Sequence, residues 1–320
     1  MPTQIIYIDP VDKLIIEKDS SLFFAHELRR QGANVKIMLK NDLFLSTKRG
    51  CEVSVYDFES SLSDGFYLDH FILTNRSKKN INQTDTIHMR LEPPFDVSYM
   101  RSLWILNFFK HKSNCKIIND PTGIFVNNEK ITSLYSSNYI DTFIGASEYH
   151  FLAKLKEYKQ DNISEIILKP LDLFQGIGVE KVSIRENFKK ATELFTSKVQ
   201  SYNGPIMVQP FCNEVTSGEI RAIFYNSKLI GAIKKIPVEG SYLANIAQGA
   251  NFKKQNLNDE QQKACEHICT ILGQNVPWVA FDIIGDKISE VNITCPGLLV
   301  EVSSAENKNL ARIISEMVVE

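Results

Sequence analysis

The chain has 320 residues, of which 43% are hydrophobic and 23% are charged, which is typical of a globular protein and excludes a disordered or collagen-like one. Lysine and arginine total 36 against 38 for aspartate and glutamate, so the net charge of -2 lacks the basic excess that nucleic-acid binding needs. No apolar run approaches the roughly 18 residues of a membrane span. We therefore expect a cytoplasmic protein of about two domains, without nucleic-acid or membrane partners.

Six cysteines are spread along the chain without a CxxC pair. A cytoplasmic chain of this length has no need of disulfides, so we interpret all six as free thiols. Cys265 and Cys269 lie one helical turn apart while His267 points elsewhere, which is poor geometry for tetrahedral zinc. A zinc site is therefore disfavoured.

The first elements alternate between strand and helix. The β-branched run 5–8 predicts a buried strand, and Asp19 with the two serines after it offers N-cap oxygens for a helix. Gly32 is typical of the residue after a helix, and residues 35–39 predict the next strand. This order predicts a βαβ unit with a parallel sheet.

The α/β pattern continues to about residue 120. Residues 60–65 and 75–86 are polar and are interpreted as loops. A helix is predicted at about 99–110 and a strand at 116–119. The Pro-Thr-Gly sequence at 121–123 is interpreted as punctuation, and we place a domain boundary there.

The second half combines antiparallel strands with separate helices. Strand-like runs at 166–168 and 206–208 flank a helix whose apolar residues recur at helical spacing between 188 and 199. Residues 221–225 and 229–233 predict an antiparallel hairpin. Two further helices are predicted, one that begins with a capping box of Asn258 and Gln261 and ends at Gly273, and one at 310–317. An α+β arrangement thus follows an α/β one.

The segment from Phe281 to Gly297 predicts a second hairpin, whose register decides where its acidic residues lie. A two-residue turn at 285–286 would place apolar and acidic side chains on one face, which packs badly. A three-residue turn over 285–287 instead pairs Asp282 with Glu290 and sorts the apolar residues onto the opposite face, with Ser289 as the exception. We predict the three-residue turn.

In that register three oxygen ligands converge on one face of the hairpin. Asp282 and Glu290 lie opposite each other, about 5 Å apart at their Cβ atoms, and Asn292 pairs with Ala280 on the same face. Oxygen-only ligands of this kind suit Mg²⁺, which keeps waters and takes phosphate oxygens to complete its shell. The alternative is an ordinary solvated hairpin face.

A lysine followed by a glycine loop stands at residues 167–179. A strand ends at Lys169, and Gly176 and Gly178 allow backbone N–H groups to bend toward an anion. The loop is neither a Walker A loop nor a GxGxxG loop, and taken alone the lysine could be an ordinary surface residue. Lysine, glycine loop and oxygen-ligand hairpin together indicate Mg-nucleotide chemistry.

These motifs resemble the ATP-grasp ligases, and the whole chain resembles the bacterial type of glutathione synthetase. The resemblance covers the chain essentially from end to end, and it rests on segments that stand in the family's order: Ile8-Asp9-Pro10, Lys18-Asp19-Ser20-Ser21, Met89 to Asp96, Asn128-Glu129-Lys130, Lys169-Pro170-Leu171-Asp172, Met207 to Phe211, Arg221, Lys235-Ile236-Pro237, Asn245-Ile246-Ala247 with Gly249, and Asp282 to Asn292. It implies a Rossmann-like domain at 1–122, an ATP-grasp domain at 123–320 and a small lid at about 130–205.

The resemblance also implies roles for individual residues. ATP would contact Lys130, Lys169, the loop of Gly176 and Gly178, the adenine hinge of Gln209 and Phe211, and Glu219. Two Mg²⁺ ions, with Mn²⁺ as the alternative metal, would be held by Asp282, Glu290 and Asn292. The substrate side would include Lys235, Asn245 and the segment 90–95. Arg221 would steady the reacting carboxylate; its alternative is a strand arginine paired with a nearby acid.

The activity that the resemblance implies is ligation of γ-glutamylcysteine to glycine through an acyl phosphate, with ADP and phosphate as products. Three departures concern the acceptor side, because Lys235, Leu243 and Val300 stand where the family tends to have arginines. Lys235 keeps the positive charge but lacks the bidentate fork, and the other two supply no donor. The alternatives are an ATP-grasp ligase for another amino acid or peptide pair and an inactive nucleotide-binding paralogue. Small-molecule substrates are expected, and a homo-oligomer is open.

Overall fold

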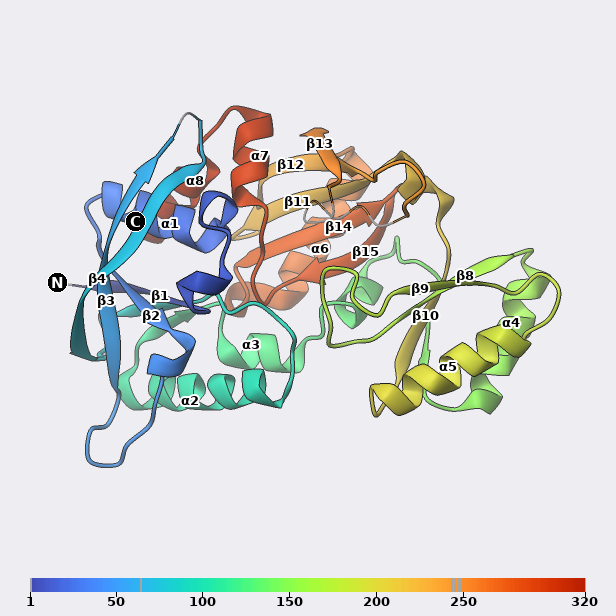
Figure 1. Ribbon diagram of the computed structural model, residues 1–320, viewed down its shortest axis with the longest axis horizontal. Helices are drawn as coiled ribbons and strands as arrows, with labels where there is room; N and C mark the ends of the chain where they lie inside the picture. Colours follow the sequence, from blue (N-terminus) through green and yellow to red (C-terminus); the bar gives the residue numbers. More distant parts are fainter. Residues whose placement is uncertain (1, 64, 243, 245, 247–248, 320) are drawn as a thin grey trace.

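A computed structural model of the chain describes residues 2–63, 65–242, 244, 246 and 249–319. Figure 1 shows three sheets, with the N-terminal sheet at one end, the lid of β8, β9 and β10 at the other, and the C-terminal sheet between them. No helix in the part of the chain that is described is long and apolar enough to cross a membrane. Short 3-10 helices lie between the main elements: η1 (Val11–Lys13), η2 (Ile16–Lys18), η3 (Lys40–Asp42), η4 (Ile131–Tyr135), η5 (Asn213–Ser217) and η7 (Gly273–Asn275).

The N-terminal sheet has six strands in the order β4-β3-β2-β1-β5-β6. The strands are β1 (Thr3–Ile8), β2 (Asn34–Leu39), β3 (Glu52–Leu62), β4 (Leu68–Asn80), β5 (Thr86–Met89) and β6 (Lys116–Ile118). The predicted parallel pairing of β1 with β2 is confirmed, and β5 and β6 extend the parallel part on the other side. Helices α1 (Ser20–Arg30), α2 (Val97–Ser113) and α3 (Pro121–Val126) accompany this sheet.

The predicted start of α1 is confirmed by its cap. One carboxylate oxygen of Asp19 accepts hydrogen bonds from the backbone N–H groups of Ser21 (2.9 Å) and Leu22 (2.8 Å). The cap therefore fixes the start of α1 directly after the end of η2, and both segments face the cavity described below.

Three expectations for the N-terminal half were wrong. The loops predicted at 60–65 and 75–86 are wrong for 60–62 and 75–80, where β3 continues to Leu62 and β4 to Asn80, because the two strands pair with each other in an antiparallel hairpin. Their outer residues are polar and exposed, so they lack the apolar signal of a core strand. The sequence at 121–123 begins helix α3, with Pro121 at a first-turn position and Asp120 as N-cap.

The lid sheet has the order β7-β10-β8-β9 and is covered by two helices. Its strands are β7 (Phe143–Gly145), β8 (Glu165–Lys169), β9 (Glu180–Ser183) and β10 (Ile206–Pro210), and the helices are α4 (Glu148–Gln160) and α5 (Lys189–Ser201). Apolar side chains of α4 and α5 bury one face of the sheet, where Phe151 and Phe195 stack at 4.2 Å between ring centroids. The lid thus has a core of its own, which leaves its other face to the cavity.

The C-terminal sheet has the order β13-β12-β11-β14-β15 and carries the predicted hairpins. Its strands are β11 (Glu219–Tyr225), β12 (Lys228–Ile236), β13 (Asn251–Lys254), β14 (Trp278–Ile284) and β15 (Lys287–Asn292), and its helices are α6 (Asp259–Leu272), α7 (Leu299–Glu306) and α8 (Leu310–Val319). The capping box of Asn258 and Gln261 at α6 is confirmed. Helix α6 packs in one core cluster, while α7 and α8 share a second with α1 and the N-terminal sheet.

One buried amide ties the N-terminal sheet to the C-terminal one. The side chain of Asn119 donates to the carbonyl oxygens of Trp278 and Ile293, both at 2.7 Å, and accepts from the backbone N–H of Trp278. Together with the shared core, this fixes the two sheets relative to each other. The limits of the domains at residue 122 and of the lid at 130–205 remain predictions.

Candidate functional site

A cavity of about 580 Å³ lies where the three sheets meet. Its walls come from the segment after β1, from the lid strands and the glycine loop, and from the C-terminal hairpins. The predicted residues on its wall are Lys130, Lys169, Gly176, Gln209, Phe211, Glu219, Arg221, Lys235, Asp282, Glu290 and Asn292. The structure thus brings together residues that are spread over more than 160 positions of the sequence.

The acidic hairpin has the predicted pairing but not the predicted turn. Asp282 pairs with Glu290, and Ala280 pairs with Asn292. The turn is nevertheless the two-residue one at 285–286, with Gly285 at a φ of 61°, because Ile284 pairs with Lys287 and Ile283 with Ile288. The register shifts by one residue between Asp282 and Ile283, so Ser289 is the extra residue of a β-bulge.

The bulge residue Ser289 is held by hydrogen bonds on the cavity side. Its hydroxyl lies 3.2 Å from a carboxylate oxygen of Glu219 and 3.1 Å from the carbonyl oxygen of Asp282. A polar side chain at the bulge therefore finds partners that a regular strand position on the apolar face would not offer. This explains why Ser289 was the exception in the sequence pattern.

Asp282 is surrounded by hydrogen-bond donors. Arg221 binds its two carboxylate oxygens with Nε (2.9 Å) and a terminal nitrogen (2.7 Å), while Lys235 donates at 2.7 Å and Asn292 at 3.1 Å. Burial alone would raise the pKa of Asp282, but the charges of Arg221 and Lys235 outweigh it and hold that pKa well below its usual range. Asp282 is therefore ionised at every physiological pH.

Lys235 joins a second acid to this group. Its ammonium lies 2.7 Å from a carboxylate oxygen of Glu219 and 2.7 Å from Asp282. Burial raises the pKa of Glu219, and the neighbouring Lys235 opposes that rise. We call Glu219, Arg221, Lys235 and Asp282 the charged quartet; it holds two charges of each sign and all four side chains line the cavity.

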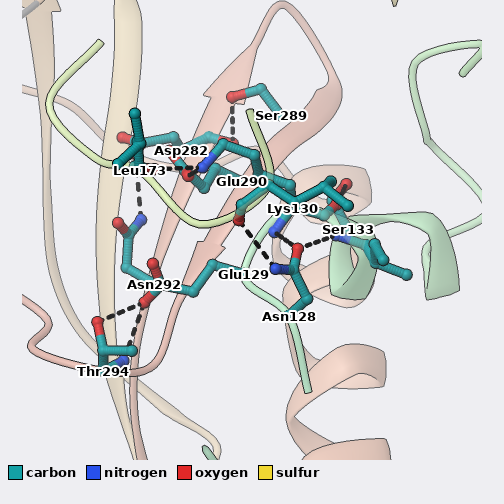
Figure 2. A network of polar contacts seen from close by, with 12 residues as sticks. Asn128, Glu129, Lys130, Ser133, Leu173, Asp282, Ser289, Glu290, Asn292 and Thr294 are labelled. Atoms are coloured by element: carbon teal, nitrogen blue, oxygen red, sulfur yellow. Dashed lines mark hydrogen bonds and ion pairs between the residues drawn. The ribbon is translucent and has the colours of Figure 1, made fainter. Parts of the chain in front are cut away.

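Glu290 has a cationic partner of its own. The ammonium of Lys130 lies 3.0 Å from a carboxylate oxygen of Glu290 and donates to the carbonyl oxygen of Leu173 at 2.6 Å. Figure 2 shows Lys130 pointing toward Glu290, with Asn128 beside it. The side-chain oxygen of Asn128 accepts from the backbone N–H of Lys130 at 3.0 Å, which fixes the start of η4. Lys130 thus connects the acidic hairpin with the glycine loop.

Glu129 is a site residue to which the sequence gave no role, although it stands inside a motif of the resemblance. One of its carboxylate oxygens accepts from the backbone N–H groups of Ile293 (2.8 Å) and Thr294 (2.9 Å) and from the Thr294 hydroxyl (2.8 Å). Figure 2 shows the bonds between Glu129 and Thr294, which follows the end of β15. Burial and the charge of Glu290 raise the pKa of Glu129. Glu129 therefore holds the chain directly after Asn292.

Lys169 and the glycine loop form the lid side of the cavity. Burial lowers the pKa of Lys169, and the nearby acids Glu290 and Glu219 oppose that change. Gly176 lies on the wall with a φ of 77°, a backbone conformation that glycine adopts without strain. Gly178 (φ 72°) lies behind the wall: a Cβ there would be 2.5 Å from the Tyr202 hydroxyl oxygen. Gly178 thus shapes the loop rather than facing the cavity.

The predicted adenine hinge forms a partly aromatic corner. Phe211 packs edge to face against Tyr242, with 6.0 Å between the ring centroids, and the ammonium of Lys181 lies 4.3 Å from the centre of the Phe211 ring. Gln209 is buried and donates to the Thr142 hydroxyl at 2.9 Å. Its side-chain oxygen has no hydrogen-bond partner among the described residues. Tyr242 carried no motif in the sequence and was missed.

The N-terminal domain closes the opposite side of the cavity. Of the predicted segment 90–95, Glu92 and Pro93 lie on the wall. Arg90 is buried instead: it donates to the Ser21 hydroxyl (3.0 Å) and the Pro296 carbonyl oxygen (2.8 Å) and lies 4.3 Å above the Trp278 ring. Burial raises the pKa of Glu92 to about 7.

Two expectations about the acceptor side meet different outcomes. Val300 is fully buried in the core shared by α7, α8 and α1, so its lack of a donor has no direct effect on a ligand in the cavity. The neighbouring wall positions are Leu298 and Glu301. Leu243 and Asn245 lie outside the described residues. The roles given to Lys235 and Asn245 in substrate binding remain predictions.

The side-chain oxygen atoms at the hairpin are suitable ligands for a divalent cation. Asp282 and Glu290 supply carboxylate oxygens, and Asn292 uses its amide nitrogen for hydrogen bonds to Asp282 and Ala280, which leaves the amide oxygen as a ligand. Within the described ranges no group of three or more His, Cys, Asp or Glu side chains could hold a metal alone. The set is therefore suited to a cation that takes further ligands from a phosphate.

Two family models match the chain almost from end to end. The model described as prokaryotic glutathione synthetase, N-terminal domain, matches residues 3–124, and the model described as prokaryotic glutathione synthetase, ATP-grasp domain, matches residues 129–307. The glutathione synthetase of Buchnera aphidicola subsp. Schizaphis graminum is 29% identical over 317 residues, which cover 98% of this chain and 95% of the relative. That of Prochlorococcus marinus subsp. pastoris is 29% identical over 321 residues, covering 98% and 97%.

Solved structures of ATP-grasp ligases share the fold. D-cycloserine synthetase DcsG has a TM-score of 0.68 at 13% identity, with 98% of this chain and 99% of that chain covered. The ligase PsnB in complex with its minimal precursor has a TM-score of 0.63 at 12% identity, with 100% and 99% covered. At these identities the likeness concerns the fold alone.

Proposed function

Since the chain belongs to the prokaryotic glutathione synthetase family, we propose that it joins the cysteine carboxylate of γ-glutamylcysteine to the amine of glycine. The chain is an ATP-dependent carbon–nitrogen ligase with an ATP-grasp fold, and such a ligase binds ATP and a divalent metal. The proposal concerns the two substrates, which the resemblance to glutathione synthetases implies, and the choice of Mg²⁺, which a PsnB complex with Mg and ADP also contains.

The reaction has two steps. A carboxylate oxygen attacks the γ-phosphorus of ATP, the bond to the β-phosphate oxygen breaks, and ADP leaves. The amine nitrogen then attacks the acyl carbon of the acyl phosphate, inorganic phosphate leaves and the amine loses a proton. No protein nucleophile is needed, so the protein contributes positions and charges.

The observation that carries the proposal is the meeting of oxygen ligands and lysines in one cavity. Asp282, Glu290 and Asn292 project from β14 and β15 toward the cavity that Lys130 and Lys169 also line. A divalent metal bound at these oxygens would neutralise part of the phosphate charge and polarise the γ-phosphate. We infer that Lys130 and Lys169 bind phosphate oxygens, and that the Gly176 loop covers them with backbone N–H groups.

The hinge and Arg221 complete the proposed site. The Phe211 and Tyr242 rings offer an apolar slot for adenine, and the unpartnered oxygen of Gln209 can accept a hydrogen bond from the adenine amino group. Arg221 uses its Nε and one terminal nitrogen for Asp282, which leaves the remaining N–H groups of its guanidinium for the reacting carboxylate. Its predicted pairing with an acid and its proposed role in catalysis are thus compatible.

The proposal is tested by ADP release in the presence of ATP and Mg²⁺. The purified chain would be assayed against a panel of carboxylate and amine pairs, with each substrate omitted in turn. We expect release that depends on γ-glutamylcysteine and glycine together. Turnover with a different pair alone would instead show a ligase of other specificity, and binding of ATP without turnover across the panel would show an inactive paralogue.

Three coarser inferences accompany this function. The six cysteines are free thiols, five of them buried, which is typical of a reducing compartment, and we propose the cytoplasm. A homo-oligomer remains a prediction that sedimentation of the purified chain can test. The substrates are small molecules or peptides, which the size of the cavity accommodates.

A further inference from the structure

Glu301 is one of the acids on the cavity wall that belong neither to the charged quartet nor to the proposed metal site. Glu301 lies in the first turn of α7 and is 3% exposed, yet it is one of the residues that line the cavity. Its Oε2 atom is buried and has no hydrogen-bond partner among the described residues. A buried oxygen without a partner is costly, so its persistence on a cavity wall indicates a ligand group that it binds.

The surroundings of Glu301 are built by two segments that lie far apart in the sequence. Lys18 and Asp19 come from the end of η2 and the cap of α1, while Leu298 precedes α7. The Ser20 hydroxyl accepts from the backbone N–H of Leu299 at 3.0 Å and so ties the start of α7 to the start of α1. Figure 1 shows α7 between α1 and the C-terminal sheet, on the side away from the lid.

The charged side chains in this corner differ in the partners they already have. Asp19 already accepts two backbone N–H groups as the N-cap of α1, so it is engaged. Burial raises the pKa of Glu301, while a hydrogen bond with its own backbone and the charges of Lys18 and Arg221 oppose that rise. The exposed ammonium of Lys18 on the same wall can accept an anionic group. The corner thus offers one buried acceptor beside an exposed cation.

We propose that Glu301 binds the ammonium group at the amino-acid end of the carboxylate substrate. The inference rests on the proposed function, in which one substrate carries a γ-linked glutamyl group. Such a group ends in a free ammonium and a free carboxylate on one carbon, and it matches an acid beside a lysine. Glu301 then selects for carboxylate substrates that end in a free amino-acid head group.

A metal ion fits this corner less well than an ammonium. Divalent cations of the hard type take six or more oxygen ligands, several of them from carboxylates, whereas Glu301 offers one buried oxygen beside a lysine. An ammonium needs only a charge-assisted hydrogen bond to that oxygen, together with shape. The neighbouring Leu298 and the stem of Lys18 supply apolar contact for the carbon chain that links the head group to the reacting carboxylate.

The test compares two substrates in two proteins. γ-Glutamylcysteine and N-glutarylcysteine differ only in the ammonium group, and kcat/KM for each is measured with the wild type and with Glu301→Gln. We expect the wild type to prefer γ-glutamylcysteine by about 10- to 100-fold, in line with a buried charge-assisted hydrogen bond. In Glu301→Gln this preference should fall to within about threefold, while the KM for ATP is unchanged.

A matched control lies at the other end of the same helix. Glu306 pairs with Lys254 and does not line the cavity in the described part of the chain, so Glu306→Gln makes the same chemical change without touching the head group. It should keep the full preference. Thermal unfolding of both variants verifies folding; because Glu301→Gln removes an unpaired buried charge, its midpoint should not fall below that of the wild type.

The outcomes separate this inference from the proposed function. A preference that survives intact in Glu301→Gln overturns the inference, and would leave Glu301 with a structural role in the first turn of α7. If the wild type does not use γ-glutamylcysteine at all, the proposed function fails. The same comparison is then made between the carboxylate substrate found in the panel and its desamino analogue, and equal use of these two by the wild type also overturns the inference.

Discussion

The charged quartet makes a prediction that does not depend on knowing the substrates. Asp282→Asn keeps the shape of the side chain but removes the anion that holds Arg221 and Lys235. Asp282 is 4% exposed, and Lys235 is 5% exposed, so water cannot replace the lost charge. The quartet, which has two charges of each sign, is then left with an excess positive charge in a buried place.

The expected cost follows from that imbalance. Breaking a buried ion pair by removal of one partner typically destabilises a protein by about 3–5 kcal/mol, because the other charge stays buried. Glu219 remains beside Lys235 and offsets part of this, so we expect a loss near the lower end, about 3 kcal/mol. The folded pKa of Asp282 is depressed, so its contribution is complete above the unfolded pKa near 4 and is lost only as the pH falls below it.

The assay is urea unfolding at pH 7 without ligands, followed by circular dichroism. Asp286→Asn is the matched control, because Asp286 is an exposed aspartate in the turn of the same hairpin whose partners are the neutral amides of Asn258 and Gln261. It should shift the free energy of unfolding by less than about 1 kcal/mol. An Asp282→Asn protein as stable as this control would refute the argument from charge balance.

A double variant tests the same argument from the other side. Asp282→Asn combined with Lys235→Met removes one charge of each sign and leaves Arg221 with Glu219. The double variant should be more stable than the sum of the two single changes predicts, with a coupling of about 1–3 kcal/mol. Strict additivity would show that Asp282 and Lys235 do not depend on each other in the folded state.

Three further predictions concern the site. Glu290→Gln should lower turnover by at least about 100-fold in a protein that still folds, since it removes a proposed metal ligand; turnover within threefold of wild type would take Glu290 out of the metal site. Gly178→Ala should destabilise the protein by about 2–4 kcal/mol and Gly240→Ala by only about 1, because both have positive φ but only the first Cβ meets side chains; equal losses by urea unfolding would contradict this. Glu92→Gln should abolish a loss of stability that the wild type shows as pH rises from about 4.5 to about 7, because the folded pKa is raised and the folded state holds the extra proton; parallel curves of melting temperature against pH would exclude it.

The acidic hairpin shows what the alternation of polar and apolar residues can predict and what it cannot. Alternation of polar and apolar residues predicted that Asp282 faces Glu290, and the structure confirms it. The same alternation cannot tell an extra residue in the turn from an extra residue in the strand, because both shift the register by one. The bulge is accompanied by tertiary contacts that alternation does not contain, such as the hydrogen bond from the Ser289 hydroxyl to Glu219, 70 residues away.

The pairing within the charged quartet could not be predicted from the sequence, for a related reason. The sequence predicted a hairpin at 221–225 and 229–233, and the strands in fact extend to Glu219 and Ile236. This extension makes Glu219 and Lys235 direct neighbours across the ladder, and Arg221 pairs with Asp282 on the next strand. Charged residues at strand ends carry little strand propensity, so their inclusion depends on the partner strands and on the buried opposite charges. The individual residues were predicted, whereas their pairing was not.

The pairing of acids with lysines in this structure bears on how ATP must bind. Lys130 is engaged by Glu290, and Lys235 is engaged by two acids of the charged quartet. A lysine that turns to a phosphate oxygen leaves its carboxylate as an unpaired buried anion, which is costly unless a cation takes its place. Conversely, a cation at the carboxylates would face the lysines at close range unless phosphate oxygens drew them away. In the proposed site we therefore expect nucleotide and divalent cation to favour each other's binding through the same side chains, and by linkage the coupling has equal strength in both directions.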